Sequence, residues 1–267
     1  MASSAAKAER GRLRGDRVPS DLEVEGSGPR VLAVHGFGGT PFEVELVLDV
    51  ARELGRGAFA PLLPGHGTRA QRLSQTGFSD WSGAVDAALE RTGTPVILAG
   101  LSLGTLLALD LTLRRPEAVK ALILLANAVW LRAPFPRWGL ALADRLRLPD
   151  FLAPKAGPDI SDPEFKRSHV SYDSDPVHAA VQVLRAGDRV RSRLGEIRCP
   201  TLILHGARDR VCPVSNAWRV AERLGSEDTR VVILPKSGHI LTRDLEHPAA
   251  RREIRAFLER FAGAAIP

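Results

Sequence analysis

The chain has 267 residues, enough to bury a full hydrophobic core without disulfides or metal ions, and its apolar content of 44% excludes an intrinsically disordered protein. The formal net charge of +6 comes mostly from arginine, but aromatic residues make up only 5% and no basic run is interleaved with them, so we expect no nucleic-acid partner. The longest apolar stretch, about 96–109, is interrupted by Gly, Ser and Thr and is too short to be a transmembrane segment.

Residues 1–18 are predicted to form a flexible basic tail. They mix Ala and Ser with positive charges and lack the apolar core of a secretory signal, so we expect a cytoplasmic protein. Cys199 and Cys212 have no metal-like neighbours in the sequence, and both are predicted to be reduced thiols. The sequence indicates no metal and no organic cofactor.

Strand-like and helix-like segments alternate from about residue 30, which predicts an α/β domain over 19–267 with a mostly parallel central sheet flanked by helices. The first strand is expected at 31–35. A helix then begins near Thr40, where Pro41 fits the first helical position and Glu43 completes a capping box. The later strands are expected at 58–63, 95–99, 121–125, 201–205 and 230–234, with helices at about 79–91, up to 115, and after Pro248.

The alternation stops between about 127 and 190, where a Pro-rich interval separates two core strands. Such a long excursion predicts a small helical cap inserted into the domain, with an amphipathic piece over 138–148. Its apolar side chains either line an acyl pocket or form the cap's own small core, and helical spacing alone favours neither. The candidate substrate-binding residues in this interval are Trp130, Phe135, Trp138, Leu142 and Phe151.

The strongest chemical signal is Gly-Leu-Ser-Leu-Gly at 100–104, directly after one predicted strand and before a helix. A serine there sits on a sharp, strained turn, and side chains two residues to either side would collide, so both of those positions require glycine. The turn lifts the hydroxyl of Ser102 above the edge of the sheet. We predict that Ser102 is a nucleophile.

A serine hydroxyl needs a base to activate it, and the base needs an acid to hold its tautomer. Along the chain the acid and the base are expected after later strands, in that order. His239 follows the strand at 230–234 in a short loop and is the predicted base, whereas His247 precedes Pro248 and is typical of a helix start.

The acid is expected directly after the strand at 201–205. Asp209 is the first carboxylate there and is the predicted acid. Asp188 comes before that strand, and Asp228 and Asp244 fall in other loops.

Two backbone amides are predicted to form an oxyanion hole. One belongs to Leu103, at the start of the helix after the serine, where the helix N-terminus favours negative charge. The other belongs to Phe37 in the glycine-rich loop after the first strand, where glycines let the backbone approach the substrate closely. His35 is expected to brace this loop.

Over residues 31–262 the chain resembles the α/β-hydrolase superfamily, and within it bacterial carboxylesterases and monoacylglycerol lipases. The resemblance rests on the segments HGFGGT (35–40), LPGHG (63–67), DW (80–81), GLSLG (100–104), HGARD (205–209) and SGH (237–239). It implies an α/β-hydrolase fold with a cap inserted between two core strands. Thr105 departs from the glycine or small residue that often follows the elbow in these esterases.

The residues and the resemblance together predict a carboxylic ester hydrolase that works through an acyl-enzyme on Ser102, with a small-molecule ester substrate carrying an apolar acyl group. Two alternatives stay open. One is a thioesterase or carbon–carbon bond hydrolase on the same triad, and the other is a non-catalytic ligand-binding protein on the same fold.

Overall fold

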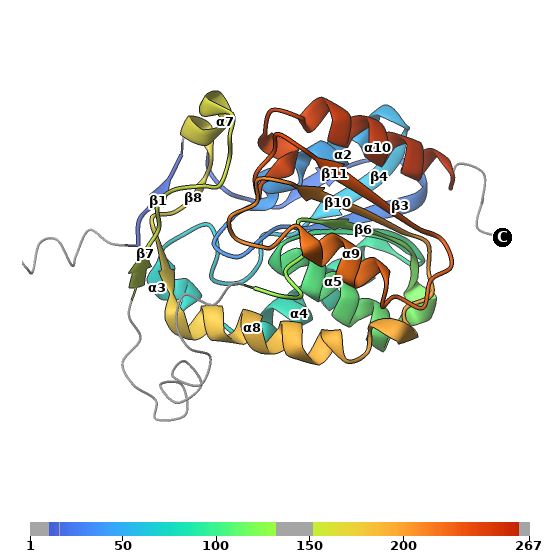
Figure 1. Cartoon of the computed structure of the whole chain (residues 1–267), viewed down its shortest axis with the longest axis horizontal. Coiled ribbons are helices and arrows are strands. Elements are labelled where there is room, and N and C mark those ends of the chain that lie inside the picture. The colour runs from blue at the N-terminus through green and yellow to red at the C-terminus, as the bar shows by residue number, and fades with distance from the viewer. Residues whose placement is uncertain (1–10, 16, 132–151, 262–267) are drawn as a thin grey trace, which may run out of the picture.

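The computed structural model describes residues 11–15, 17–131 and 152–261. Its centre is a seven-stranded sheet in the order β11-β10-β6-β5-β3-β4-β2 (Figure 1). All neighbouring strands are parallel except β2, which pairs antiparallel with β4. The mostly parallel sheet predicted from the sequence is confirmed. The strands are β2 (Leu22–Val24), β3 (Ser27–Val34), β4 (Arg56–Ala60), β5 (Val96–Leu101), β6 (Val119–Leu125), β10 (Thr201–Gly206) and β11 (Thr229–Leu234).

Helices cover both faces of the sheet, which explains why β5 and β10 are buried along their whole length. Figure 1 shows α2 and α10 on one face and α4, α5, α8 and α9 on the other. The helices are α2 (Glu45–Glu53), α3 (Ala70–Leu73), α4 (Phe78–Thr92), α5 (Leu103–Arg114), α7 (Pro163–Ser168), α8 (Val177–Arg191), α9 (Ser215–Ala221) and α10 (His247–Glu259). Short 3-10 turns lie at Pro41–Glu43, Pro116–Ala118, Leu194–Glu196 and Leu241–Arg243.

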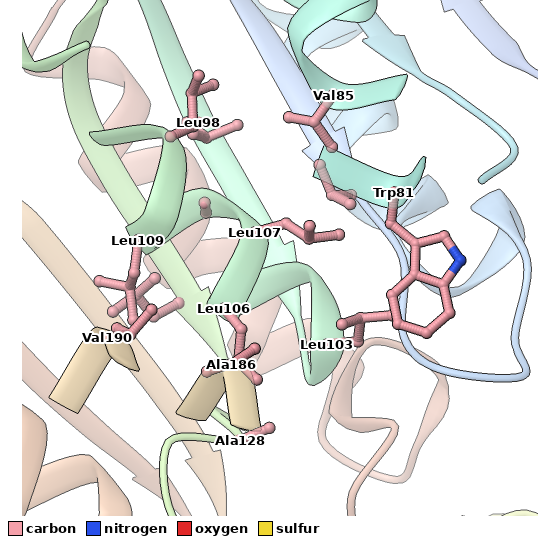
Figure 2. Close-up of a cluster of buried hydrophobic side chains, with 14 of the residues drawn as sticks. Trp81, Val85, Leu98, Leu103, Leu106, Leu107, Leu109, Ala128, Ala186 and Val190 are labelled. Carbon is pink, nitrogen blue, oxygen red and sulfur yellow. The ribbon is translucent and has the colours of Figure 1, made fainter. Parts of the chain in front are cut away.

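Helix α5 is buried on almost every side, between β5, α4 and α8 (Figure 2). Leu107 lies toward α4, whereas Leu106 lies toward Ala186 of α8. Each fully buried leucine contributes roughly 1.5–3 kcal/mol through removal of its side chain from water. Since α5 begins directly after Ser102, this packing fixes the position of the serine relative to the sheet.

The described part of the predicted insertion contains three short strands, β7 (Leu152–Pro154), β8 (Ser171–Tyr172) and β9 (Ser174–Pro176), besides α7 and α8. Helix α8 differs from the expected cap, because Val183, Ala186 and Val190 belong to the same hydrophobic core as α4 and α5. The first turns of α8 pack elsewhere, since Val177 and Val181 form a separate small cluster with Ala153 of β7. The predicted boundary of the insertion at about 190 stays a prediction. The amphipathic piece expected at 138–148, with Phe135, Trp138, Leu142 and Phe151, lies outside the described residues.

The N-terminal segment also differs from the expected free tail. Strand β1 (Leu13–Arg14) pairs antiparallel with β8, and the amide of Gly11 donates to the side chain of Asp173 at 2.8 Å. Further along, Arg17 forms an ion pair with Glu45 at the start of α2. Strand β8 offers an unpaired edge that a passing backbone can satisfy, which accounts for the ordered pairing.

Cys199 and Cys212 are both free, as predicted, and burial raises the pKa of the Cys199 thiol to about 11. Among the residues that the structure describes, no helix has the length and apolar character needed to cross a membrane. The cytoplasmic location stays a prediction from the sequence.

Candidate active site

Ser102 occupies the turn between β5 and α5 with φ 54° and ψ −113°, a backbone conformation that a non-glycine residue rarely adopts. The two flanking glycines are required by close backbone approach. A Cβ atom on Gly100 would lie 2.2 Å from the carbonyl oxygen of Gly104, and one on Gly104 would lie 2.0 Å from that of Val34. The turn thus has the strained geometry that the sequence predicts.

Thr105, the departure from the related motif, has a structural role at this turn. Its hydroxyl donates to the carbonyl of Ser102 at 2.6 Å and accepts the amide of Ala128 at 3.2 Å. Ala128 lies just beyond β6, so the threonine links the serine turn to the neighbouring strand end. A glycine or alanine at 105 could not make this link.

Asp209 and His239 meet at the ends of β10 and β11. Nδ1 of His239 lies 2.8 Å from Oδ2 of Asp209, and both side chains are almost fully buried. The other carboxylate oxygen accepts the amides of Val211 and Cys212 at 2.8 and 2.7 Å. These bonds hold the carboxylate in one orientation, and the carboxylate directs the ring nitrogen Nε2 of His239 away from itself.

His205 is a second imidazole partner of Asp209, and no role was predicted for it from the sequence. Its Nε2 atom lies 3.1 Å from Oδ2 of Asp209 and 3.3 Å from the carbonyl oxygen of Cys212, so Nε2 carries the hydrogen. The sequence did hold a signal for this contact. His205 is the last residue of the predicted strand at 201–205 and precedes Asp209 by four residues, so both side chains are expected at the same end of the sheet.

The electrostatics of this cluster follow from its burial and its charges. Burial alone would raise the pKa of Asp209, but the imidazoles of His239 and His205 outweigh it and the pKa lies well below its usual value. Burial alone would lower the pKa of His239, but the Asp209 carboxylate outweighs it and raises the pKa well above the ordinary histidine value. Asp209 is therefore ionised near neutral pH.

Asp209, Cys212 and His239 are also the described residues whose donor atoms come close enough together, within 4.8 Å, to be considered for a metal ion. Asp209 already accepts two amides and contacts two imidazoles. We therefore assign the group to acid–base chemistry rather than to metal binding.

The glycine-rich loop after β3 carries Phe37, the other predicted oxyanion donor. His35 braces the loop, as expected: its Nδ1–H donates to the carbonyl of Gly36 at 2.9 Å and its Nε2 accepts the amide of Leu63 at 3.1 Å. The Phe37 ring packs edge-on against the rings of Trp81 and His66. Leu103, the first predicted donor, begins α5, where the first amides of a helix have no acceptor within the helix.

The predicted capping box at Thr40 and Glu43 is wrong. No side-chain bond caps the turn at Pro41–Glu43, and α2 begins only at Glu45. Glu43 is instead buried, accepts the amide of Gly36 at 2.8 Å and lies 3.4 Å from Nε2 of His169. Burial would raise the pKa of Glu43, but the contact with His169 outweighs it and the pKa is lowered. The glutamate supports the oxyanion loop rather than a helix end.

Ser102 and His239 line one cavity of about 440 Å³, a size typical of small-molecule sites. Asp175 and Lys155, 2.6 Å apart, form an ion pair in its wall beside Gly38. The apolar part of the described wall is formed by Phe37, Leu131, Ala180, Val183, Val211 and Ile240.

Trp130, the one described member of the predicted substrate-binding set, does not contact this cavity. The Arg219 guanidinium lies 3.9 Å from the centre of its ring, and Arg191 and Arg223 lie 5.2 and 5.4 Å from it. The indole is thus enclosed by cations on the α8 and α9 side. Its neighbour Leu131 does line the cavity, and the substrate-binding role of Trp130 stays a prediction that this packing does not support.

Residues 28–246 match the model of a protein family described as Serine aminopeptidase, S33, a span that covers most of the chain. The chain belongs to this family. The chain is 28% identical over 236 residues to "Thermostable monoacylglycerol lipase" of Bacillus sp. (strain H-257), and the alignment covers 87% of this chain and 91% of the relative. It is 25% identical over 249 residues to "Carboxylesterase" of Bacillus subtilis (strain 168), covering 91% and 97% of the two chains.

Among solved structures, one of a metagenome-derived lipolytic enzyme superimposes on this chain with a TM-score of 0.83 and 25% sequence identity. The superposition covers 91% of this chain and 98% of the other. These matches confirm the α/β-hydrolase fold and the resemblance inferred from the motifs. They support the prediction of an ester-hydrolysing enzyme.

Proposed function

We propose that this S33 family member hydrolyses carboxylic esters through a triad of Ser102, His239 and Asp209. The observation that carries the proposal is that Ser102 and His239 line the same cavity. Ser102, held in a strained turn, lines the same cavity as His239, and the imidazole of His239 is hydrogen-bonded to a buried, ionised Asp209. A nucleophile, a base and an orienting acid in this order are the elements of acyl transfer.

The reaction begins when Nε2 of His239 removes the hydroxyl proton of Ser102 while Oγ attacks the ester carbonyl. Because Nδ1 is bound to Asp209, Nε2 is the nitrogen left to act as base. The tetrahedral intermediate collapses, and the alcohol departs with the proton from His239. Water, deprotonated by the same imidazole, then releases the carboxylic acid and restores Ser102.

The oxyanion of each tetrahedral intermediate is proposed to accept the amides of Phe37 and Leu103. The two donors come from different elements, the loop after β3 and the start of α5, and both elements are held rigidly. The loop is fixed through His35 and Glu43, and the helix is buried against α4 and α8. Removal of one such donor typically lowers turnover by about 10²- to 10³-fold.

The cavity supports an apolar acyl group. Its described wall is mostly apolar, and it includes Leu131 beyond β6 and Ala180 and Val183 of α8. The same cavity is also lined by Glu43, His169 and the Lys155–Asp175 pair, which suit a polar alcohol. An ester with one apolar and one hydroxylated end, such as a monoglyceride, matches both kinds of lining residue, in line with the lipase among the relatives.

A fluorophosphonate probe tests the nucleophile directly, because it phosphonylates an activated serine. We expect stoichiometric labelling of the wild type and none of Ser102→Ala. The same variant is expected to lose turnover of p-nitrophenyl butyrate by roughly 10⁴- to 10⁶-fold. Labelling and turnover that persist in Ser102→Ala reject the triad, and a wild type that does not label supports the ligand-binding alternative.

A substrate panel tests the bond that is cleaved. We expect monoacylglycerol and p-nitrophenyl ester hydrolysis to exceed cleavage of acyl thioesters, of vinylogous diketones and of amino-acyl anilides, the last included because of the family's description. A higher kcat/KM for a thioester or diketone assigns the triad to the corresponding alternative chemistry. A higher kcat/KM for an anilide assigns it to amide cleavage.

A further inference from the structure

Asp159 begins a short segment of the insertion between β7 and α7, residues 159–162, which we call the return segment. Its side chain is only 11% exposed and lies at the wall of the cavity. Its Oδ2 atom accepts two backbone amides, that of Arg210 at 2.8 Å and that of His239 at 3.3 Å. Arg210 directly follows the proposed acid Asp209, and His239 is the proposed base. One carboxylate oxygen thus joins the two loops that carry the acid and the base.

Backbone contacts reinforce this link on both sides of His239. The amide of Ile240 donates to the carbonyl oxygen of Asp159 at 3.3 Å. A Cβ atom on Gly238 would lie 2.7 Å from that same oxygen, so the two backbones touch and only glycine fits at 238. The position of the His239 loop therefore depends on the return segment that Asp159 begins.

A second buried carboxylate, Asp244, holds the return segment in place. It is fully buried and accepts the amides of Ser161 and Asp162, both at 2.9 Å, and that of Gly238 at 2.7 Å. Asp244 thereby joins the return segment to the His239 loop. Asp159 adds a second link to the His239 loop and, through the amide of Arg210, also connects the loop that carries Asp209.

We propose that Asp159 is a positioning residue of the reaction, and the proposal rests on the proposed triad. Through the amides of Arg210 and His239 it sets the separation of the acid and base loops, and hence where Nε2 of His239 lies relative to Ser102. Its neutral analogue cannot replace it fully. Asn has one acceptor oxygen, and its NH2 group would face either an amide donor or the Arg210 guanidinium.

The Arg210 side chain contributes less than the two amides. Its Nε atom donates to Oδ1 of Asp159 at 2.7 Å, but the Arg210 side chain is 72% exposed, so water and salt screen the ion pair. The amide bonds are short-range and lie at the edge of the cavity. Two variants can separate the contributions, since loss of the arginine side chain leaves the Arg210 amide bonded to Asp159.

The test compares steady-state kinetics on p-nitrophenyl butyrate and the rate constant for phosphonylation in Asp159→Asn and in the wild type. A misplaced base slows both reactions at Ser102, so we expect kcat and the phosphonylation rate to fall together by about 10- to 100-fold. KM is expected to stay within about threefold, because binding of the ester does not require the base. Asp159→Ser, which keeps no oxygen at the place of Oδ2, is a second variant with the same expectation.

Asp162→Asn is the matched control: it makes the same change three residues along, and the Asp162 side chain caps α7 rather than bonding to a triad loop. We expect its kcat to stay within about twofold of the wild type, and that of Arg210→Gln to fall by no more than about threefold. Thermal unfolding verifies that each variant is folded at the assay temperature.

Three results would overturn the positioning role: an unchanged kcat in both Asp159 variants, a rise of KM alone, or equal losses in Asp159→Asn and Arg210→Gln. Ser102→Ala in the same series separates this failure from failure of the proposed function. An active Ser102→Ala rejects the triad itself. An inactive Ser102→Ala beside fully active Asp159→Asn and Asp159→Ser rejects only the positioning role.

Discussion

The carboxylate of Glu43 accepts the amide of Gly36 over 2.8 Å, across seven residues of the loop that carries Phe37. The other carboxylate oxygen faces Nε2 of His169 at 3.4 Å. The loop that supplies one proposed oxyanion donor is thus held by a buried acid that also contacts an imidazole of the insertion. This arrangement gives the buried acidic side chain a structural role close to Ser102.

Glu43→Ala is expected to reduce both stability and turnover. It leaves the buried amide of Gly36 and the ring of His169 without their acceptor, which costs about 1–3 kcal/mol of unfolding free energy. The freed loop also misplaces the Phe37 amide, so kcat falls by at least about tenfold. Denaturant unfolding and ester kinetics measure the two effects. Glu45→Ala removes a partly exposed carboxylate two residues away and should cost less than about 1 kcal/mol.

The pH dependence of kcat/KM reports the base. His239 must be neutral to remove a proton, so kcat/KM rises with pH through its pKa. Asp209 raises that pKa, so the wild-type midpoint lies above about 6.5, the ordinary histidine value. In Asp209→Asn the midpoint moves to lower pH, while turnover falls by about 10⁴-fold because the tautomer is no longer held. Identical midpoints in the two proteins would contradict the assignment of this pair.

Two glycine-to-alanine changes are expected to have opposite signs. In Gly104→Ala the new Cβ would lie 2.0 Å from the Val34 carbonyl oxygen, so β3 and α5 must separate and the stability falls by about 3 kcal/mol or more. Gly83 is exposed within α4, and a Cβ there meets nothing within 4 Å. Gly83→Ala should therefore gain about 0.5–1 kcal/mol. Thermal and denaturant unfolding of both variants measure the difference.

Ala180→Phe should shorten the preferred acyl chain. Ala180 lies on α8 in the wall of the cavity, and a phenyl ring there occupies space that the proposed site gives to the acyl group. We expect kcat/KM for p-nitrophenyl decanoate to fall by at least about tenfold, while that for the acetate stays within about threefold. The acetate thus controls for damage to the triad. An equal fall of kcat/KM for the decanoate and the acetate would contradict the proposal that the acyl chain lies against Ala180.

Local patterns in the sequence predicted the elements and the order of the site. Apolar runs of five or six residues fit strands buried on both faces, and the glycines around Ser102 fit a turn where two backbones touch. Asp209 and His239 each follow such a run, and strands of a parallel sheet end at one edge. Their meeting at 2.8 Å was therefore predictable without coordinates.

Contacts between distant segments were not predictable in this way. The spacing of Glu43 from Thr40 fits a capping box. In the structure, however, the buried Glu43 side chain binds the amide of Gly36 and contacts His169, and it does not cap a helix. The first eighteen residues read as a free tail because the edge of β8, which pairs with Leu13 and Arg14, is formed by chain some 160 residues away.

The sequence by itself determined the fold and the strained turn at Ser102, and it predicted the proposed acid and base, because each depends on a short run of residues and on the rule that parallel strands end together. Only the tertiary structure decided what holds those groups in place. The side chains of Thr105 and Asp159 form hydrogen bonds to backbone amides, and the type of a residue does not reveal which side chain its backbone amide will bind.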